Sequence, residues 1–288
     1  MWREELSDLM HGVGGALLFG VPLLYTMEVW WLGSHVAPWH MLAGLLLTYI
    51  TLIALNRATG FRRHSDQSFA RSLTDSIEAL AIGLLVAAGS LWLLRRINVS
   101  IGIEPMLGHI VLEGIPFGLG VGIANGIFRS NDDADQADSA QVDQAPSDES
   151  QESQSIWKST LADAGSTALG AIIVAFSIAP TDEVPMIASA LTPWLLLLIV
   201  AVSLIVSYVI VFVADFGSRE DRKQDRGLFQ SPITETVVSY IIALIMVAIM
   251  LVLFKQVDFS SPLHQWVDYI VTLGLPATVG GAAGRLAV

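Results

Sequence analysis

The chain has 288 residues, of which 53% are hydrophobic and 15% are charged, with a mean hydropathy of +0.60 and a formal net charge of −12. Ordinary soluble domains carry about 25% charged residues. The apolar residues here also come in blocks close to the ~20 that cross a bilayer as a helix. The composition therefore predicts a polytopic all-α membrane protein, and the lack of cysteine excludes disulfides and thiolate metal sites.

Eight apolar segments predict transmembrane helices, and the amino terminus shows no cleavable signal peptide. They cover roughly residues 11–32, 39–56, 75–94, 106–127, 160–180, 191–214, 234–254 and 264–284. The fourth and eighth are rich in small residues, which allow helices in lipid to approach closely. We therefore expect these two to line the interior of the bundle.

An acidic segment separates the two halves of the chain. Residues 130–155 hold eight acids and no base, so the rest of the chain carries only about −4 of the net charge. Such a segment cannot bury enough apolar surface to offset its ordering entropy. It predicts a disordered cytoplasmic linker between domains at 1–129 and 156–288; a tail that collects cations or binds a partner is the alternative.

The basic residues predict the orientation. With eight spans, both termini lie on one side, and that side holds twelve of the Lys and Arg residues against three on the other. Because basic residues accumulate on the cytoplasmic side, we expect a cell-membrane protein with both termini in the cytoplasm.

The two halves of the chain resemble each other. A shift of 155 residues aligns them up to the first charged loop, and a shift of 160 continues the alignment beyond it. The matched residues include Thr26 with Thr181, Glu28 with Glu183, Pro38-Trp39 with Pro193-Trp194, Asp75 with Glu235, Gly114 with Gly274, Pro116 with Pro276, and Gly120 with Gly280. Their constant order favours duplication over chance similarity between apolar segments. The duplication predicts two parallel four-helix repeats.

The strongest repeated polar feature is a Thr-x-Glu-Val motif, with Thr26 and Glu28 in one copy and Thr181 and Glu183 in the other. Carboxylate and hydroxyl oxygens are ligands for hard cations. Both motifs lie near the outer end of the first helix of their half, and prolines around the second one indicate a broken helix. The alternative is an interfacial position, in which nearby tryptophans form an aromatic belt.

A second candidate is His109 with Glu113, one helical turn apart in the fourth span. Glu113 lies about 10 Å inside that span at ~1.5 Å per residue. Such a pair can pass a proton or share a cation; a structural polar pair between helices is the alternative.

Asp75 and Glu235 occupy equivalent positions at the predicted cytoplasmic starts of the third and seventh spans. They are candidates for a cytoplasmic gate. Acids in the first turn of a helix are common, however, since the helix dipole favours them. Ser72 before Asp75 has the spacing of a capping box, and Ser231-Pro232 predicts an N-cap followed by a proline at the first helical position.

The stretch PLLYTMEVWW, the FRR after it and the segment SLTDSIEALAIG resemble an uncharacterised family of prokaryotic integral membrane proteins. The resemblance covers most of the chain outside the linker. It implies an integral membrane protein and does not indicate an activity.

These patterns favour a transporter or channel for a small ion, a cation or protons, that uses the paired carboxylates of Glu28 and Glu183. A membrane scaffold or sensor whose acidic linker binds a partner is the alternative, and an intramembrane enzyme has the least support. We expect no cofactor beyond a possible bound cation, whose identity the sequence does not give. The expected partners are the lipid bilayer, the small ion and a possible second copy of the chain, with no nucleic acid.

Overall fold

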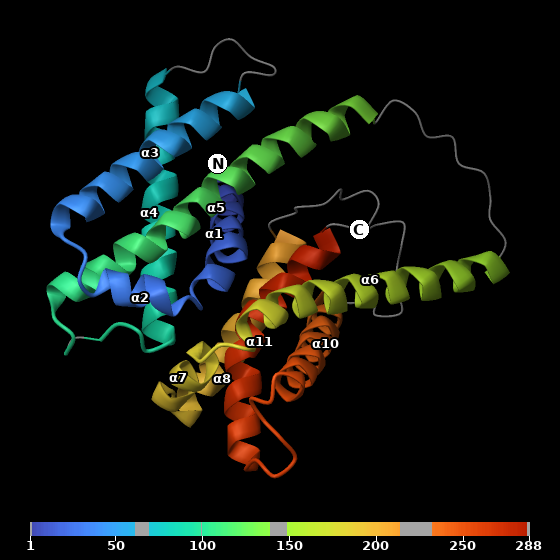
Figure 1. Ribbon diagram of the computed structural model, residues 1–288. Helices are drawn as coiled ribbons and strands as arrows, with labels where there is room; N and C mark the ends of the chain where they lie inside the picture. Colours follow the sequence, from blue (N-terminus) through green and yellow to red (C-terminus); the bar gives the residue numbers. More distant parts are fainter. Residues whose placement is uncertain (1, 61–68, 99, 139–148, 214–231, 287–288) are drawn as a thin grey trace.

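The computed structural model describes residues 2–60, 69–98, 100–138, 149–213 and 232–286, and every regular element within them is a helix (Figure 1). The first half contains α1 (Trp2–Leu23), α2 (Met27–Gly33), α3 (Pro38–Gly60), α4 (Phe69–Leu93) and α5 (Ile103–Asp138). The second half contains α6 (Glu149–Ile178), α7 (Glu183–Ala190), α8 (Pro193–Tyr208) with the π-helical turn η1 (Val209–Val213), α10 (Pro232–Leu253) and α11 (Leu263–Leu286).

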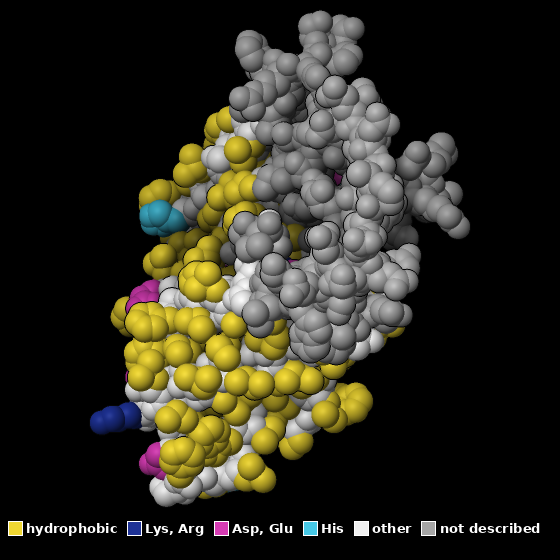
Figure 2. Space-filling model, turned by 90° about the vertical axis from the view of Figure 1, so that its right-hand side faces the viewer, with side chains coloured by type: hydrophobic (Ala, Val, Ile, Leu, Met, Phe, Trp, Pro, Cys, Tyr) yellow, Lys and Arg dark blue, Asp and Glu magenta, His cyan; other side chains and the backbone are white. Residues whose placement is uncertain are grey.

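Five helices are long and apolar enough to cross a membrane, or up to seven if each of two bent helix pairs counts as one span. The five candidates are Pro38–Asn56, Ser72–Leu93, Ile103–Ala124, Pro193–Phe212 and Pro232–Leu253. Hydrophobic side chains cover most of the described surface in Figure 2, and charged side chains are few. The chain is therefore an all-helical membrane protein.

The first of the two bent pairs corrects the predicted first span. Residues 11–32 do not form one straight helix, because α1 ends at Leu23 and α2 leaves it at an angle of 97°. Pro22 lies in the last turn of α1, where a proline disfavours the continuation of the helix. In the second half α6 and α7 meet at 90°, with Pro180 in the break, as the prolines there predicted.

Helices α5 and α11 form the interior of their halves. In α11, every residue from 271 to 282 is buried, although this helix is not among the five apolar candidates. Glycines make this burial possible: a Cβ atom on Gly15 of α1 would lie 2.5 Å from the Gly120 carbonyl oxygen of α5. A Cβ on Gly170 of α6 would lie 2.1 Å from the Gly280 oxygen of α11. Small residues therefore line the interior here, as predicted.

Several predicted features lie at the margin of the described chain. Helix α5 continues to Asp138 and α6 begins at Glu149, so both reach into the segment predicted as a linker. Residues 139–148 of that segment, like the charged loops at 61–68 and 214–231, lie outside the described residues. The disordered linker stays a prediction.

Candidate functional site

The two Thr-x-Glu-Val motifs meet where the halves of the molecule pack together. The Met27 backbone N–H, in the first turn of α2, donates to Glu183 Oε1 at 3.3 Å. Beside it, the Tyr25 hydroxyl donates to the Thr272 carbonyl oxygen of α11 at 2.6 Å. Both helix breaks therefore lie at the junction of the halves, and segments 156 residues apart in the chain come into direct contact.

The paired glutamates have different environments within this junction. Glu183 is 6% exposed, and its Oε2 is buried with no hydrogen-bond partner. Glu28 is exposed. Its neighbour Thr26 is the N-cap residue of α2 but makes no capping bond with its side chain. The Thr181 hydroxyl donates to the Ile178 carbonyl oxygen at 2.6 Å. The segments converge, but only one of the two carboxylates is buried.

The second candidate pair is buried more deeply. His109 is 6% exposed and Glu113 is 1% exposed. The candidate span begins at Ile103 rather than at 106 and ends at Ala124. Glu113 is therefore ten residues inside it, or about 15 Å at ~1.5 Å per residue, which is the middle of a ~30 Å hydrocarbon layer. A carboxyl group at this depth is costly and usually faces a path or a partner inside the protein.

Helix α2 packs directly over His109. The His109 Nε2 lies 2.7 Å from the Trp30 carbonyl oxygen and 2.9 Å from the Ser34 hydroxyl. A Cβ atom on Gly33 would lie 2.6 Å from His109 Cδ2, and one on Gly108 would lie 2.0 Å from the Gly33 carbonyl oxygen. Glycine at both positions lets the backbones approach closely enough for the imidazole to reach α2.

Two residues that were not assigned to a site in the sequence complete the cluster. The Arg96 guanidinium lies over the Trp30 ring, 4.7 Å from its centroid, and it is close enough to His109 for an electrostatic interaction. The Trp30 indole lies beside the Glu113 carboxyl group. In the sequence, Arg96 indicated only the orientation of the chain in the membrane, and Trp30 indicated only an aromatic belt. The sequence feature that could have indicated a role for Arg96 is its position directly after a long apolar helix.

Four atoms of this cluster are buried and lack a hydrogen-bond partner: Trp30 Nε1, Arg96 Nη1, His109 Nδ1 and Glu113 Oε1. Buried polar atoms normally have partners, because an unsatisfied one costs about 1–3 kcal/mol. We call these four residues, Trp30, Arg96, His109 and Glu113, the α5 cluster. Among the described residues of the first half, it has the most buried polar atoms without a hydrogen-bond partner.

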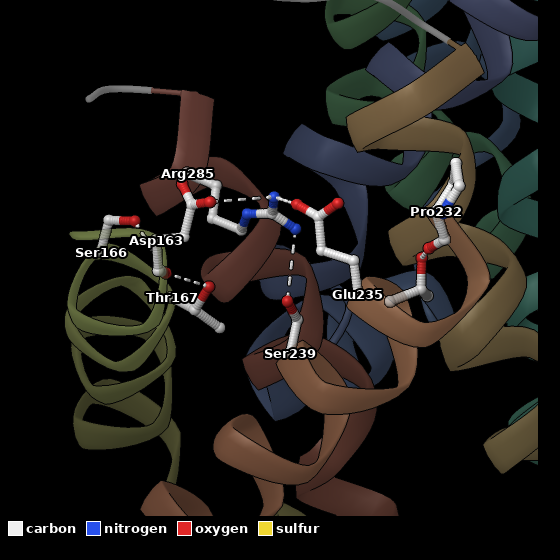
Figure 3. Close-up of polar contacts among 8 residues, drawn as sticks. Asp163, Ser166, Thr167, Pro232, Glu235, Ser239 and Arg285 are labelled. Atoms are coloured by element: carbon white, nitrogen blue, oxygen red, sulfur yellow. Dashed lines mark hydrogen bonds and ion pairs between the residues drawn. The ribbon is translucent and has the colours of Figure 1, made fainter. Parts of the chain in front are cut away.

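Asp75 and Glu235 do not come together. Glu235 pairs with Arg285 of α11, whose side chain is 6% exposed, and Arg285 also lies 3.9 Å from Asp163 of α6 and 3.3 Å from the Ser239 hydroxyl (Figure 3). Asp75 lies half-buried on α4 in the other half. A gate at these residues stays a prediction.

The two helix starts at these acids have different outcomes. The capping box predicted at Ser72 is wrong, because α4 begins earlier, at Phe69, and the Ser72 carbonyl accepts a bond from Ser76 inside the helix. The predicted first position of Pro232 is confirmed, because α10 begins there. A proline is tolerated at this position, where its missing N–H would have no helical partner.

No group of three or more His, Asp or Glu side chains that could hold a metal ion occurs among the described residues. A cation at the junction would therefore rely on Glu183 with hydroxyl or carbonyl oxygens, and the identity of any metal stays open.

The comparisons with known proteins agree with the helical membrane architecture. A family model described as "Putative integral membrane protein (DUF2391)" matches residues 8–288, which is nearly the whole chain. No curated protein and no solved structure matches the chain. With long apolar helices, an apolar surface and this match, the chain belongs to the DUF2391 family of integral membrane proteins.

Proposed function

We propose that this protein moves a small ion, a cation or a proton, across the membrane. The observation that carries the proposal is a buried carboxylate with an unpartnered oxygen in each half: Glu113 in the middle of a span, and Glu183 at a helix break. Ionisable groups in such places are rare and usually belong to ion pathways, because keeping them buried is costly.

The path we propose runs along the junction of the halves. Broken helices leave backbone groups without helical partners, and in membrane proteins such backbone lines cavities or sites. Both helix breaks meet at this junction, where Glu183 lies against α2. In this arrangement Glu183 is the buried acid of the path, while Glu28, Thr26 and Thr181 lie at its mouth.

We also propose that the two halves arose by duplication and form parallel repeats. The proposal is supported by the ends of α4 and α10, where Arg95 and Lys255 both have φ of 58°. The next residues, Arg96 and Gln256, donate their backbone N–H groups to Leu91 and Leu251, at 2.8 and 2.9 Å. These pairs keep the shift of 160 residues found in the sequence.

Side-chain packing also supports duplication. A Cβ on Gly114 would lie 2.5 Å from Leu84, and one on Gly274 would lie 2.6 Å from Leu244. The contacts of Gly15 with Gly120 and of Gly170 with Gly280 correspond in the same way. With the bent pairs and α11 counted as spans, the proposed topology has eight passes through the cell membrane and both termini in the cytoplasm. A reporter enzyme fused to the carboxyl terminus tests this, and activity only outside the cytoplasm contradicts it.

Ion flux in proteoliposomes tests the function directly. Purified protein is reconstituted, and the flux of protons, Na⁺, Ca²⁺ and Mn²⁺ is followed with ion-sensitive dyes. We expect at least one ion to move and Glu183→Gln to lower its flux on the order of tenfold or more, because the buried acid is lost. Glu104→Gln is the matched control, since Glu104 is an exposed acid at the start of α5. If no ion moves, or if both variants behave alike, the proposal is wrong.

A further inference from the structure

The α5 cluster has hydrogen-bonding properties that the proposed path through Glu183 does not use. His109 Nε2 lies 2.7 Å from the Trp30 carbonyl oxygen, which can only accept a hydrogen bond. The Nε2 atom must therefore carry the hydrogen. In a neutral imidazole the other nitrogen, Nδ1, then has a free lone pair; this atom is buried without a well-formed hydrogen bond, and the Arg96 backbone lies near the ring.

Glu113 presents a second acceptor on the same face of the same helix. It follows His109 by one helical turn, a spacing that places side chains next to each other. Its Oε1 is buried without a well-formed hydrogen bond, and the Trp30 indole is the donor group beside this carboxyl group. Neither His109 Nδ1 nor Glu113 Oε1 therefore has its full set of hydrogen bonds. A proton on the Glu113 carboxyl group supplies a hydrogen that a neighbouring acceptor such as Nδ1 can accept.

The charges around Glu113 come from few groups. The Arg96 guanidinium, over the Trp30 ring, is the cation nearest to this cluster among the described residues. Helix α1 has no charged residue from Gly12 to its end at Leu23. Among the described residues, the other Asp, Glu, His and Arg side chains on or next to these elements are exposed or lie toward the far ends of their helices: His11 on α1, Glu28 on α2, His35 after α2, His40 on α3, Asp75 and Glu78 on α4, Arg95 after α4, and Glu104 on α5.

The few charged groups around Glu113 favour the binding of a proton over the binding of a metal cation. Glu113 is the single carboxylate of the cluster, and the same cluster already holds the positive charge of Arg96, which lies over the Trp30 ring and acts on His109. A metal ion would add charge beside a guanidinium with one carboxylate to hold it, whereas hard cations prefer several oxygen ligands. A proton needs only the lone pair and the carboxylate.

We propose that His109 and Glu113 form a proton-binding site, with Arg96 as its fixed counter-charge, and that the protein transports protons or exchanges them for its cation. The proton-binding site stands on the α5 cluster alone, while its role in transport rests on the proposed function. The corresponding positions of the second half hold Tyr269 and Leu273 in place of His109 and Glu113, so the pair is not repeated there.

Infrared difference spectroscopy tests proton binding without any flux. Reconstituted protein is titrated with pH, and the carbonyl stretch of a protonated carboxylic acid is followed. We expect a buried carboxylic-acid band that disappears as pH rises, is absent in Glu113→Gln and is unchanged in Glu104→Gln. In His109→Gln the titration midpoint should move by about one pH unit, since one of the two acceptors is lost. If Glu113→Gln keeps the band, or if wild type has none, the site is wrong.

A proton-flux assay in the same vesicles separates this proposal from the proposed function. We expect a pH gradient to drive flux in wild type and Glu113→Gln to lower it on the order of tenfold or more. A cation flux that does not change with pH and is the same in Glu113→Gln as in wild type would overturn the proton proposal and leave the proposed function in place. A titrating band without any ion flux would overturn the function and keep the proton site. If Glu113→Gln does not fold, Arg96→Gln takes its place, because loss of the counter-charge should move the midpoint to higher pH.

Discussion

The first half of the molecule buries the ionisable residues His109 and Glu113 on α5, near Arg96 after α4, while the second half has uncharged side chains at the corresponding positions. Leu273 of α11, 0% exposed, corresponds to Glu113 of α5. Gln256 corresponds to Arg96 and donates to the Thr181 carbonyl oxygen at 3.2 Å. Similar helix packing thus surrounds two different interiors.

At the opposite helix ends, the described residues of the second half form a charged cluster. Arg285, near the end of α11, is held between Glu235 at the start of α10 and Asp163 of α6. The residue of the first half that corresponds to Arg285 is Asn125, which carries no charge. The comparison indicates that the two halves have the same close helix contacts but different polar residues at corresponding positions. We expect the first half to carry the titrating site and the second half the tighter lock between helices.

The largest expected effect comes from moving the carboxylate into the other half. Leu273→Glu should lower the free energy of unfolding by about 3–5 kcal/mol, because it buries an acid with no arginine or histidine prepared for it. Glu113→Gln should cost less than about 1 kcal/mol, since it keeps the side-chain volume. Unfolding in mixed detergent micelles, followed by tryptophan fluorescence, measures both. If Leu273→Glu is as stable as wild type, the two interiors do not differ as we describe.

Glycine contacts test the similarity of the halves. Gly15→Ala and Gly170→Ala should each cost about 1–3 kcal/mol, because the new Cβ overlaps the carbonyl oxygen of the facing helix. Gly89→Ala and Gly165→Ala are matched helical controls with no neighbouring atom within 4 Å, and they should be neutral or slightly stabilising. The same unfolding assay applies. A cost in one half only would show that the two halves pack differently.

The smallest expected effect concerns the ion pairs of Arg285. Arg285→Met should cost about 1–2 kcal/mol, mainly through the pairing of Glu235, which is 28% exposed. Asp163 is 49% exposed and should contribute little, because water screens its charge. In a double-mutant cycle, Glu235→Gln should cost less in the Arg285→Met background than in wild type. Strict additivity would show that the pair does not stabilise the second half.

The apolar blocks predicted most of the helices, because a bilayer requires long runs of apolar residues in which helices satisfy the backbone. Prolines around the second motif predicted the break before α7, and the deep position of Glu113 followed from its place in the fourth block. The predicted continuous span at 11–32 is wrong, because Pro22 alone did not reveal how sharply the chain turns. The central place of α11 was indicated by its small residues.

The sequence by itself determined the membrane character of this protein and its helical architecture, and it supplied the candidate residues for a proton or ion site, since these follow from local composition and spacing. Tertiary structure decided which of them are buried. It gave Glu183 and Glu28 different environments, although their motifs are alike. Glu183 is buried against the start of α2, while Glu28 is exposed. It also brought Trp30 and Arg96 to His109 and Glu113 from other elements, and helical periodicity describes only one helix at a time.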